Sequence, residues 1–258
     1  MSLPELPCLK PAKTPDHILW VRVDRPEKHH AVNFDVIRSL EKVMDYVESK
    51  PEIRVLILSG TGHHYFISGG DLKEFHKLTS KDQAILMSER MGTLLRRIED
   101  VDCWTVACIN GDAYGGGCET MLAFDFRIAV KHARFGFTQG RFYLPPGWGG
   151  LTRLVERVGR STALMWLGSQ AMVSTDEALN AGLIDKLFTS DHLKESILAF
   201  ADKLSGNDRN LIKALKQGAK KAVSQSRMES IAAERELFSD FWANPEHFKR
   251  VEEFINKR

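Results

Sequence analysis

Two short apolar runs, each leading into a glycine-rich segment, constrain this fold more than any other feature of the chain. The runs are "IRVLILSG" (53–60) and "WTVACIN" (104–110), and neither alternates polar with apolar residues. An uninterrupted, β-branched apolar run of this length is typical of a strand that is covered on both faces, as in parallel α/β sheets. The two runs therefore predict central strands of a buried sheet.

Amphipathic segments alternate with these strands. Residues 34–49 and 81–100 have helical periodicity, and Asn33 and Ser80 stand where N-cap residues are preferred. Residues 17–23 alternate with a period of two, which predicts a half-buried strand. Strands that alternate with helices indicate βαβ units, so the first half of the chain predicts an α/β fold with a mostly parallel sheet.

The later part of the chain has a different pattern, because helical periodicity dominates apart from one short strand at 184–188. Ser174 and Glu177 have the spacing of a capping box. We predict an α/β core over residues 1–195 and a helical C-terminal region over residues 196–258.

Composition excludes several classes of function. The 258 residues carry a formal net charge of only +2, and lysine and arginine are interleaved with acidic residues, so a nucleic-acid partner is not expected. No apolar run approaches the ~20 residues that span a bilayer, so no membrane association is expected. The four cysteines fit no metal-ligand spacing, which predicts no metal site and a reducing, cytoplasmic location.

The glycine-rich segments "FISGGDLKEF" (66–75) and "DAYGGGCET" (112–120) are poor phosphate-binding loops. The second has Cys-Glu-Thr where a P-loop needs lysine and a hydroxyl residue, and the dinucleotide-binding fingerprint fails both there and at "GTGHHYF" (60–66). Both precede helix-compatible residues, and free N–H groups at a helix start favour negative charge. Two such groups that converge form an oxyanion hole. The alternative is that both segments are tight turns that only allow close packing.

The chain resembles the crotonase superfamily, also called the enoyl-CoA hydratase/isomerase family. The resemblance rests on five motifs in order, which together span nearly the whole chain. They are "RPEKHHAVN", "FISGGDLKEF", "INGDAYGGGCETMLAFDFRIA", "FGFTQGRFYLPPGWGGLTRL" and "FINKR". The resemblance implies the crotonase fold, a spiral of ββα units with C-terminal helices used in trimer assembly. It also implies a homotrimer or a hexamer built as a dimer of trimers.

The resemblance implies an acyl-CoA substrate, with coenzyme A as part of the substrate and no separate cofactor. Its motifs assign the oxyanion-hole N–H groups to Gly70 and Gly116, which would stabilise an enolate formed from the thioester. Further positions are assigned to CoA or substrate binding. These are Ala31, Val32, Ser68, Gly69, Asp71, Leu72, Lys73, Phe254 and Lys257.

Two glutamates carry the proton transfers in the hydratases of this family, and this chain retains one of them. The first corresponds to Glu119, whereas the second corresponds by position to Gln139. An amide is not a useful proton carrier. His64, Arg141 and Tyr143 are other candidates for that task, although surface exposure of His64 and packing of Tyr143 are the simpler expectations.

The departure at Gln139 leaves several functions open. The favoured one is a hydratase or isomerase of enoyl-CoA in fatty acid metabolism, with Glu119 as the proton-transfer group. The second is a methylmalonyl- or ethylmalonyl-type carboxyacyl-CoA decarboxylase, which needs no base to form the enolate. The third is a non-catalytic acyl-CoA binder.

Overall fold

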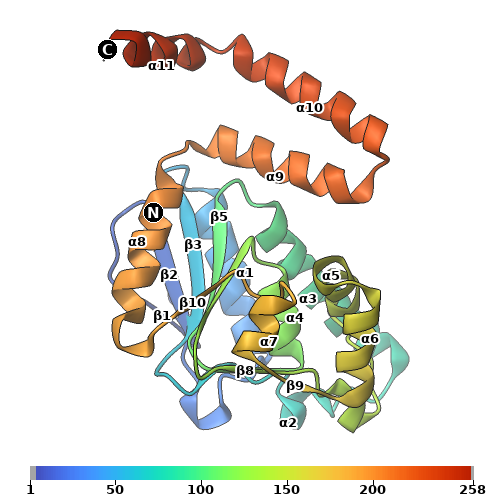
Figure 1. Ribbon diagram of the computed structural model, residues 1–258. Helices are drawn as coiled ribbons and strands as arrows, with labels where there is room; N and C mark the ends of the chain where they lie inside the picture. Colours follow the sequence, from blue (N-terminus) through green and yellow to red (C-terminus); the bar gives the residue numbers. More distant parts are fainter. Residues whose placement is uncertain (1–3, 257–258) are drawn as a thin grey trace. The chain divides into compact units, whose positions relative to one another are not determined.

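The computed structural model describes residues 4–256, and the chain divides into two compact units between Arg209 and Asn210 (Figure 1). The strands of the first unit are β1 (Leu9–Pro11), β2 (Ile18–Val23), β3 (Val55–Gly60), β4 (Tyr65–Ile67), β5 (Trp104–Ile109), β6 (Asp112–Tyr114), β7 (Phe126–Val130), β8 (Arg134–Gly136), β9 (Met172–Ser174) and β10 (Lys186–Phe188). Its helices are α1 (Phe34–Glu48), α2 (Leu72–Phe75), α3 (Lys81–Asp100), α4 (Gly116–Leu122), α5 (Gly150–Val158), α6 (Arg160–Ser169), α7 (Thr175–Asn180) and α8 (Leu193–Ser205).

The strands form two sheets. The larger has the order β1-β2-β3-β5-β7-β10 and the smaller has the order β4-β6-β8-β9. Among these strands only the pairs β1–β2 and β8–β9 are antiparallel, and the other paired strands are parallel. The expected mostly parallel α/β architecture is therefore confirmed.

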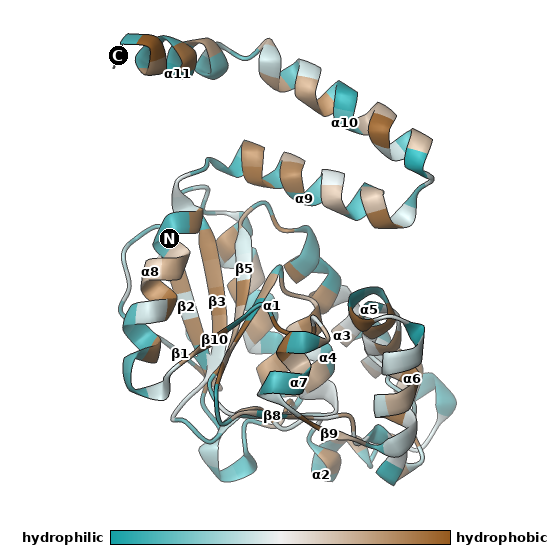
Figure 2. Ribbon diagram, viewed as in Figure 1, coloured by the Kyte–Doolittle hydropathy of each residue, from teal (hydrophilic) through white to brown (hydrophobic). Residues whose placement is uncertain are grey.

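Strand β3 is buried along its whole length, and its side chains alternate between two hydrophobic clusters. Leu56 and Leu58 face the larger cluster, whereas Val55 and Ile57 face a second cluster that includes Ile197 of α8. Figure 2 shows this strand as a hydrophobic ribbon. The prediction of a strand covered on both faces is confirmed, because helices pack on each side of the sheet.

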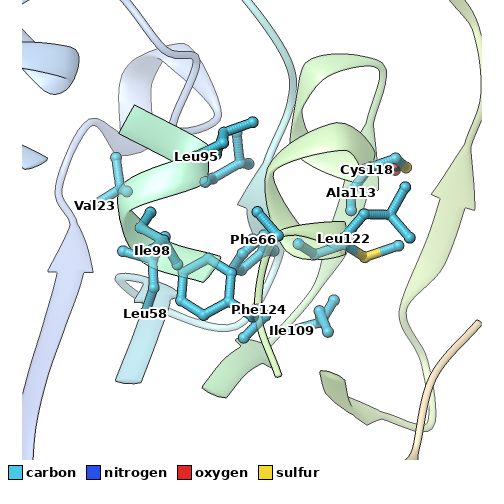
Figure 3. Close-up of a cluster of buried hydrophobic side chains, with 14 of the residues drawn as sticks. Val23, Leu58, Phe66, Leu95, Ile98, Ile109, Ala113, Cys118, Leu122 and Phe124 are labelled. Atoms are coloured by element: carbon cyan, nitrogen blue, oxygen red, sulfur yellow. Dashed lines mark hydrogen bonds between the residues drawn. The ribbon is translucent and has the colours of Figure 1, made fainter. Parts of the chain in front are cut away.

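The larger cluster joins the two sheets to the helices that follow them. Figure 3 shows side chains from β2, β3, α3, β4, β5, β6 and α4 meeting in one apolar group. The labelled members are Val23, Leu58, Phe66, Leu95, Ile98, Ile109, Ala113, Cys118, Leu122 and Phe124. Because α4 packs inside this group, the glycine run that starts α4 has a fixed backbone.

Most of the predicted helix ends are confirmed, and one is partly wrong. The Asn33 side chain accepts a hydrogen bond from the N–H of Val36, and Ser80 forms a complete capping box. Ser174 caps α7, but the Glu177 side chain does not return to it; the Glu177 carboxylate accepts the indole N–H of Trp166 instead. A tertiary hydrogen bond has thus replaced half of the expected capping box.

The sequence did not reveal the short strands β1, β4, β6 and β9. Each has three residues, which is too few to show a periodicity, and pairing with neighbouring strands defines them. Strands β4 and β6 matter most, because they lie between the predicted strands β3 and β5 and the two glycine turns.

The second unit continues from α9 (Arg209–Ser224) into α10 (Arg227–Trp242) and α11 (Pro245–Asn256). Pro245 is the first residue of α11, after the cap Asn244, and these helices agree with the helical C-terminal region that the sequence predicts. The sequence-based division at 195/196 falls inside α8, which packs on β2, β3 and β5. Among residues 4–256, no helix combines the length and apolar character that crossing a membrane requires.

Candidate active site

Two turns of similar construction lie at one edge of the smaller sheet. Strand β4 leads through Gly69 and Gly70 into α2, and β6 leads through Gly115 into α4, which begins at Gly116. Because β4 and β6 are paired and parallel, their carboxyl ends meet at the same edge. The two turns are in contact: a Cβ on Gly69 would lie 3.1 Å from the carbonyl oxygen of Tyr114 and 3.4 Å from the nitrogen of Gly116.

The geometry leaves the N–H groups of Gly70 and Gly116 available. Gly70 pairs with Val32 as two parallel strands would. The N–H of Val32 donates to the carbonyl oxygen of Gly69, and the N–H of Asp71 donates to the carbonyl oxygen of Val32. The N–H of Gly70, between these two bonds, therefore points away from Val32. Gly116 is the first residue of α4, where an N–H has no acceptor within the helix. The hydrogen bonds described for residues 4–256 give neither group a protein acceptor.

Arg25 holds the first turn in place. Its guanidinium donates to the carbonyl oxygen of Ala31 and forms an ion pair with Asp71 at 2.9 Å. Asp71 in turn caps α2 by accepting the N–H of Lys73. Burial by itself raises the pKa of Asp71, but the hydrogen bond and the charge of Arg25 outweigh it and hold that pKa below its ordinary range. Asp71 is therefore a paired anion that fixes the backbone beside Gly70.

The backbone and buried packing hold the second turn. The N–H of Gly115 donates to the carbonyl oxygen of Gly136, and the Thr120 hydroxyl donates to that of Gly116. A Cβ on Gly117 would lie 1.9 Å from the carbonyl oxygen of Ile67, the last residue of β4. Glycine is required here because the start of α4 lies directly against the backbone of the neighbouring strand.

Glu119, one helical turn into α4, is buried, with 5% of its surface exposed. Its Oε2 accepts the N–H groups of Trp148 at 2.7 Å and of Gly150 at 3.0 Å. Its Oε1 accepts the N–H of Gly147 and the side-chain amide of Gln139, both at 3.3 Å. Burial raises the pKa of Glu119, and these donors only partly counteract it. The carboxylate thus has one firmly held oxygen and one loosely held oxygen.

Glu119 reaches this position because the segment that faces it has no side chain there. A Cβ on Gly150 would lie 2.3 Å from Cγ of Glu119 and 2.7 Å from its Oε2. Gly149 precedes it with a φ of 85°, a conformation that favours glycine. The "GWGG" segment therefore wraps its backbone around the carboxylate.

Gln139 lies in the 3₁₀ turn Gln139–Phe142 and contacts Glu119, as its predicted place in the site requires. Its Oε1 is buried and has no donor among the described residues. A buried acceptor without a partner is costly, so this atom is suited to accept a hydrogen bond from a ligand or a water molecule.

The other candidate proton carriers do not join the site. His64 and Arg141 are exposed. The expectation that Tyr143 packs into the protein is wrong: its side chain is 97% exposed, because it ends the 3₁₀ turn in a left-handed conformation with a φ of 57°. Among residues 4–256, no group of three or more His, Cys, Asp or Glu side chains has the arrangement of a metal site.

Most of the positions assigned to CoA binding lie beside the first turn. Ala31 and Val32 are buried next to it, and the Ser68 N–H donates to the carbonyl oxygen of His29. Leu72 and Lys73 are exposed on the first turn of α2. Phe254 is an exposed residue of α11 in the second unit, and Lys257 lies outside the described residues.

Two residues of this region were missed from the sequence. Nothing local to Arg25 indicates its partner, because Asp71 lies 46 positions further along the chain. Trp148 did leave a visible signal, since a large aromatic side chain stands inside the glycine-rich "PPGWGG" segment. Its indole contacts the second glycine turn at Gly116.

Comparisons with known proteins agree with this architecture. A short-chain enoyl-CoA hydratase of Clostridium acetobutylicum is 29% identical over 242 residues, which cover 92% of this chain and 91% of the relative. The solved structure of DspI from Pseudomonas aeruginosa is similar, with a TM-score of 0.92 and 26% identity over 100% of this chain and 97% of that one. An enoyl-CoA hydratase from Bacillus anthracis has the same fold, with a TM-score of 0.91, 24% identity and 97% coverage of both chains.

The family profile described as "Enoyl-CoA hydratase/isomerase" matches residues 13–258. The expected family and the expected crotonase fold are both confirmed. Since the profile spans nearly the whole sequence and the fold agrees over nearly the whole chain, this protein belongs to the enoyl-CoA hydratase/isomerase family, the crotonase superfamily, and is an enzyme of that family.

Proposed function

We propose that this protein is an enoyl-CoA hydratase or isomerase in which the N–H groups of Gly70 and Gly116 bind the thioester oxygen and Glu119 transfers the proton. The proposal rests on the contact between the two glycine turns at one edge of the smaller sheet. The N–H groups of Gly70 and Gly116 lie in these turns and have no protein acceptor among the described residues. Such donors stabilise negative charge that develops on a carbonyl oxygen, by about 3–4 kcal/mol each in known cases.

The chemistry of hydration follows from one acid acting twice. Glu119 removes a proton from water, the water oxygen forms a bond to the β-carbon, and the electrons of the double bond move onto the thioester oxygen. The resulting enolate collapses as Glu119 returns the same proton to the α-carbon. Oε1 of Glu119 is suited to this exchange, because its two hydrogen bonds are longer than those of Oε2. The raised pKa of Glu119 suits both steps.

In this scheme Gln139 positions the water instead of carrying a proton. Its amide N–H already donates to Glu119, and its free, buried Oε1 can accept from a water that lies against the same carboxylate. Isomerisation of a double bond needs no water, and the same Glu119 can move a proton between the α- and γ-carbons. A single acid therefore supports slow hydration, or isomerisation.

Gln139→Glu tests this role directly. A second carboxyl at this position supplies a separate proton donor and acceptor, so we expect hydration of crotonyl-CoA to rise by at least about tenfold, since general acid–base groups contribute 10²–10⁴-fold. Steady-state rates of water addition measure it, with Gln170→Glu, at a half-buried position beside Gly140, as the control. An unchanged rate would show that position 139 does not face the reacting carbons.

Decarboxylation of a carboxyacyl-CoA is the second candidate. A substrate carboxylate meets a neutral amide at Gln139 where a glutamate would repel it, and loss of CO₂ forms the enolate without a base. The third possibility, an acyl-CoA binder without activity, is disfavoured because Glu119 and both turns are intact.

A panel of three substrates separates these functions. The purified protein is incubated with crotonyl-CoA, a 3-enoyl-CoA and ethylmalonyl-CoA, and the products are identified by mass. Water addition or double-bond migration supports the proposal. Release of CO₂ without water addition selects the decarboxylase, and CoA binding without turnover selects the binder.

We further propose that the chain assembles as a homotrimer or hexamer, uses coenzyme A as part of its substrate with no separate cofactor, and acts in the cytoplasm. The second unit carries many exposed apolar side chains, which supports assembly. They include Met228, Phe238, Trp242, Phe248 and Phe254. Light scattering during size-exclusion chromatography would give the oligomeric state, and a monomer at micromolar concentration would contradict the assembly.

A further inference from the structure

Trp148 links the acid to the two glycine turns. Its backbone N–H donates to Oε2 of Glu119 at 2.7 Å, while its side chain extends to the start of α4. A Cβ on Gly116 would lie 2.2–2.9 Å from three carbons of the indole, and a Cβ on Gly70 would lie 3.6 Å from a fourth. The indole therefore lies against both glycines, while the backbone of the same residue holds Glu119.

The indole is fixed in this position. Its exposed fraction is 5%, and its ring packs edge-on against Phe75 with centroids 6.5 Å apart. Its N–H points at the sulfur of Met87, 3.3 Å away, in α3. Three elements, namely α2, α3 and the start of α4, thus hold a single orientation of the ring. A rotation toward solvent would break all of these contacts.

The position of the ring has a consequence for the substrate. When a thioester oxygen is bound by Gly70 and Gly116, and the α- and β-carbons lie beside Glu119, the acyl group has to pass close to this indole. A rigid aromatic side chain at that place restricts the space open to the acyl group, and it obstructs a long or bulky group more than a small one.

We propose that the Trp148 side chain sets the acyl specificity of the site and selects compact acyl groups over medium-length chains. The inference rests on the proposed function, because it takes the thioester oxygen to lie at the two glycines. It adds a specificity-determining residue to that site. Substitution of the side chain leaves the backbone N–H that holds Glu119 in place, so acyl selection and proton transfer can be separated experimentally.

Binding of unreactive ligands tests the proposal without depending on turnover. Butyryl-CoA and octanoyl-CoA lack the reactive double bond and share the same CoA portion. Their dissociation constants are measured by titration calorimetry for the wild type, Trp148→Ala and Trp148→Phe. Leu151→Ala, at an exposed position in the first turn of α5, is the control. Thermal unfolding shows which variants are folded, and Trp148→Phe retains an aromatic ring if the alanine variant does not fold.

We expect the wild type and Leu151→Ala to bind butyryl-CoA at least about tenfold more tightly than octanoyl-CoA, since a filled pocket rejects a few extra methylenes by at least that factor. Trp148→Ala is expected to abolish or reverse this preference, and Trp148→Phe to reduce it. Equal binding of both ligands by the wild type, or an unchanged ratio in both variants, would overturn the role of Trp148. Failure of the wild type to bind either ligand would overturn the proposed function, and the inference with it.

Discussion

The two glycine turns are built alike but place their carboxylates in opposite environments. Each ends a three-residue strand and starts a helix, and each is followed by an acidic residue, Asp71 in one and Glu119 in the other. Asp71 has an arginine partner, and its pKa is lowered. Glu119 is buried among N–H donors, none of which carries a full charge, and its pKa is raised.

This difference shows how one local motif produces two kinds of acid. A carboxylate that is paired with a guanidinium is a stable anion and a poor proton carrier. A carboxylate that is buried without a counter-charge exchanges protons at a pH closer to neutrality. The neighbours of each side chain, and not the motif, therefore separate the structural acid from the candidate catalytic acid.

The largest expected effect compares the two acids directly. Glu119→Gln removes the proton carrier and keeps the shape of the side chain, so kcat is expected to fall by about 10²–10⁴-fold with little change in KM. Asp71→Asn keeps the cap acceptor and is expected to lower kcat by less than about tenfold, through a less firmly held first turn. Steady-state kinetics on the substrate that turns over measures both. Equal losses in the two variants would break the distinction.

A smaller loss of activity is expected when an alanine replaces Gly116 or Gly70. In Gly116→Ala the new methyl group meets the buried Trp148 ring at 2.2 Å, whereas in Gly70→Ala it meets the edge of the half-buried Phe75 ring at 2.8 Å. We expect a loss of about 10²-fold in kcat/KM for Gly116→Ala and about tenfold for Gly70→Ala, since displacement of a single oxyanion donor costs up to 10²–10³-fold. Gly92→Ala in α3, where the methyl group meets nothing within 4 Å, is the control. A greater loss in Gly70→Ala would show that the first turn is the more rigid one.

The smallest effect is on stability as a function of pH. Because the pKa of Asp71 is lowered by folding, its stabilisation is present above the ordinary aspartate range and is lost as the pH falls through the folded value. Because the pKa of Glu119 is raised, its ionisation costs stability as the pH rises through the interval above the ordinary glutamate range.

Urea unfolding of the wild type, Asp71→Asn and Glu119→Gln at a series of pH values measures these two contributions. As the pH falls, the advantage of the wild type over Asp71→Asn should shrink, and its advantage over Glu119→Gln should grow, each by on the order of 1 kcal/mol. Changes of the same sign in both variants would show that the two acids have similar environments.

Much of the fold follows from signals that lie close together in the sequence. The apolar run at 53–60 predicted a strand buried on both faces, and the side chains of Asn33 and Ser80 marked the starts of α1 and α3. These signals are readable because a strand period or a helix cap involves residues at most about four positions apart. The ordered motifs also indicated the family and the two glycine turns.

The tertiary structure decided what those turns contain. Strands β4 and β6 exist because they pair with each other, and Arg25 meets Asp71 only because Val32 is bridged to Gly70. The backbone donors to Glu119 come from 28 to 31 positions further along the chain, and the Trp148 ring covers Gly116 from the same distant segment. Composition and periodicity contain no information about such pairs, because only the folding of the chain brings these distant residues together. The burial and the partners that result from folding then set the pKa of Asp71 and of Glu119.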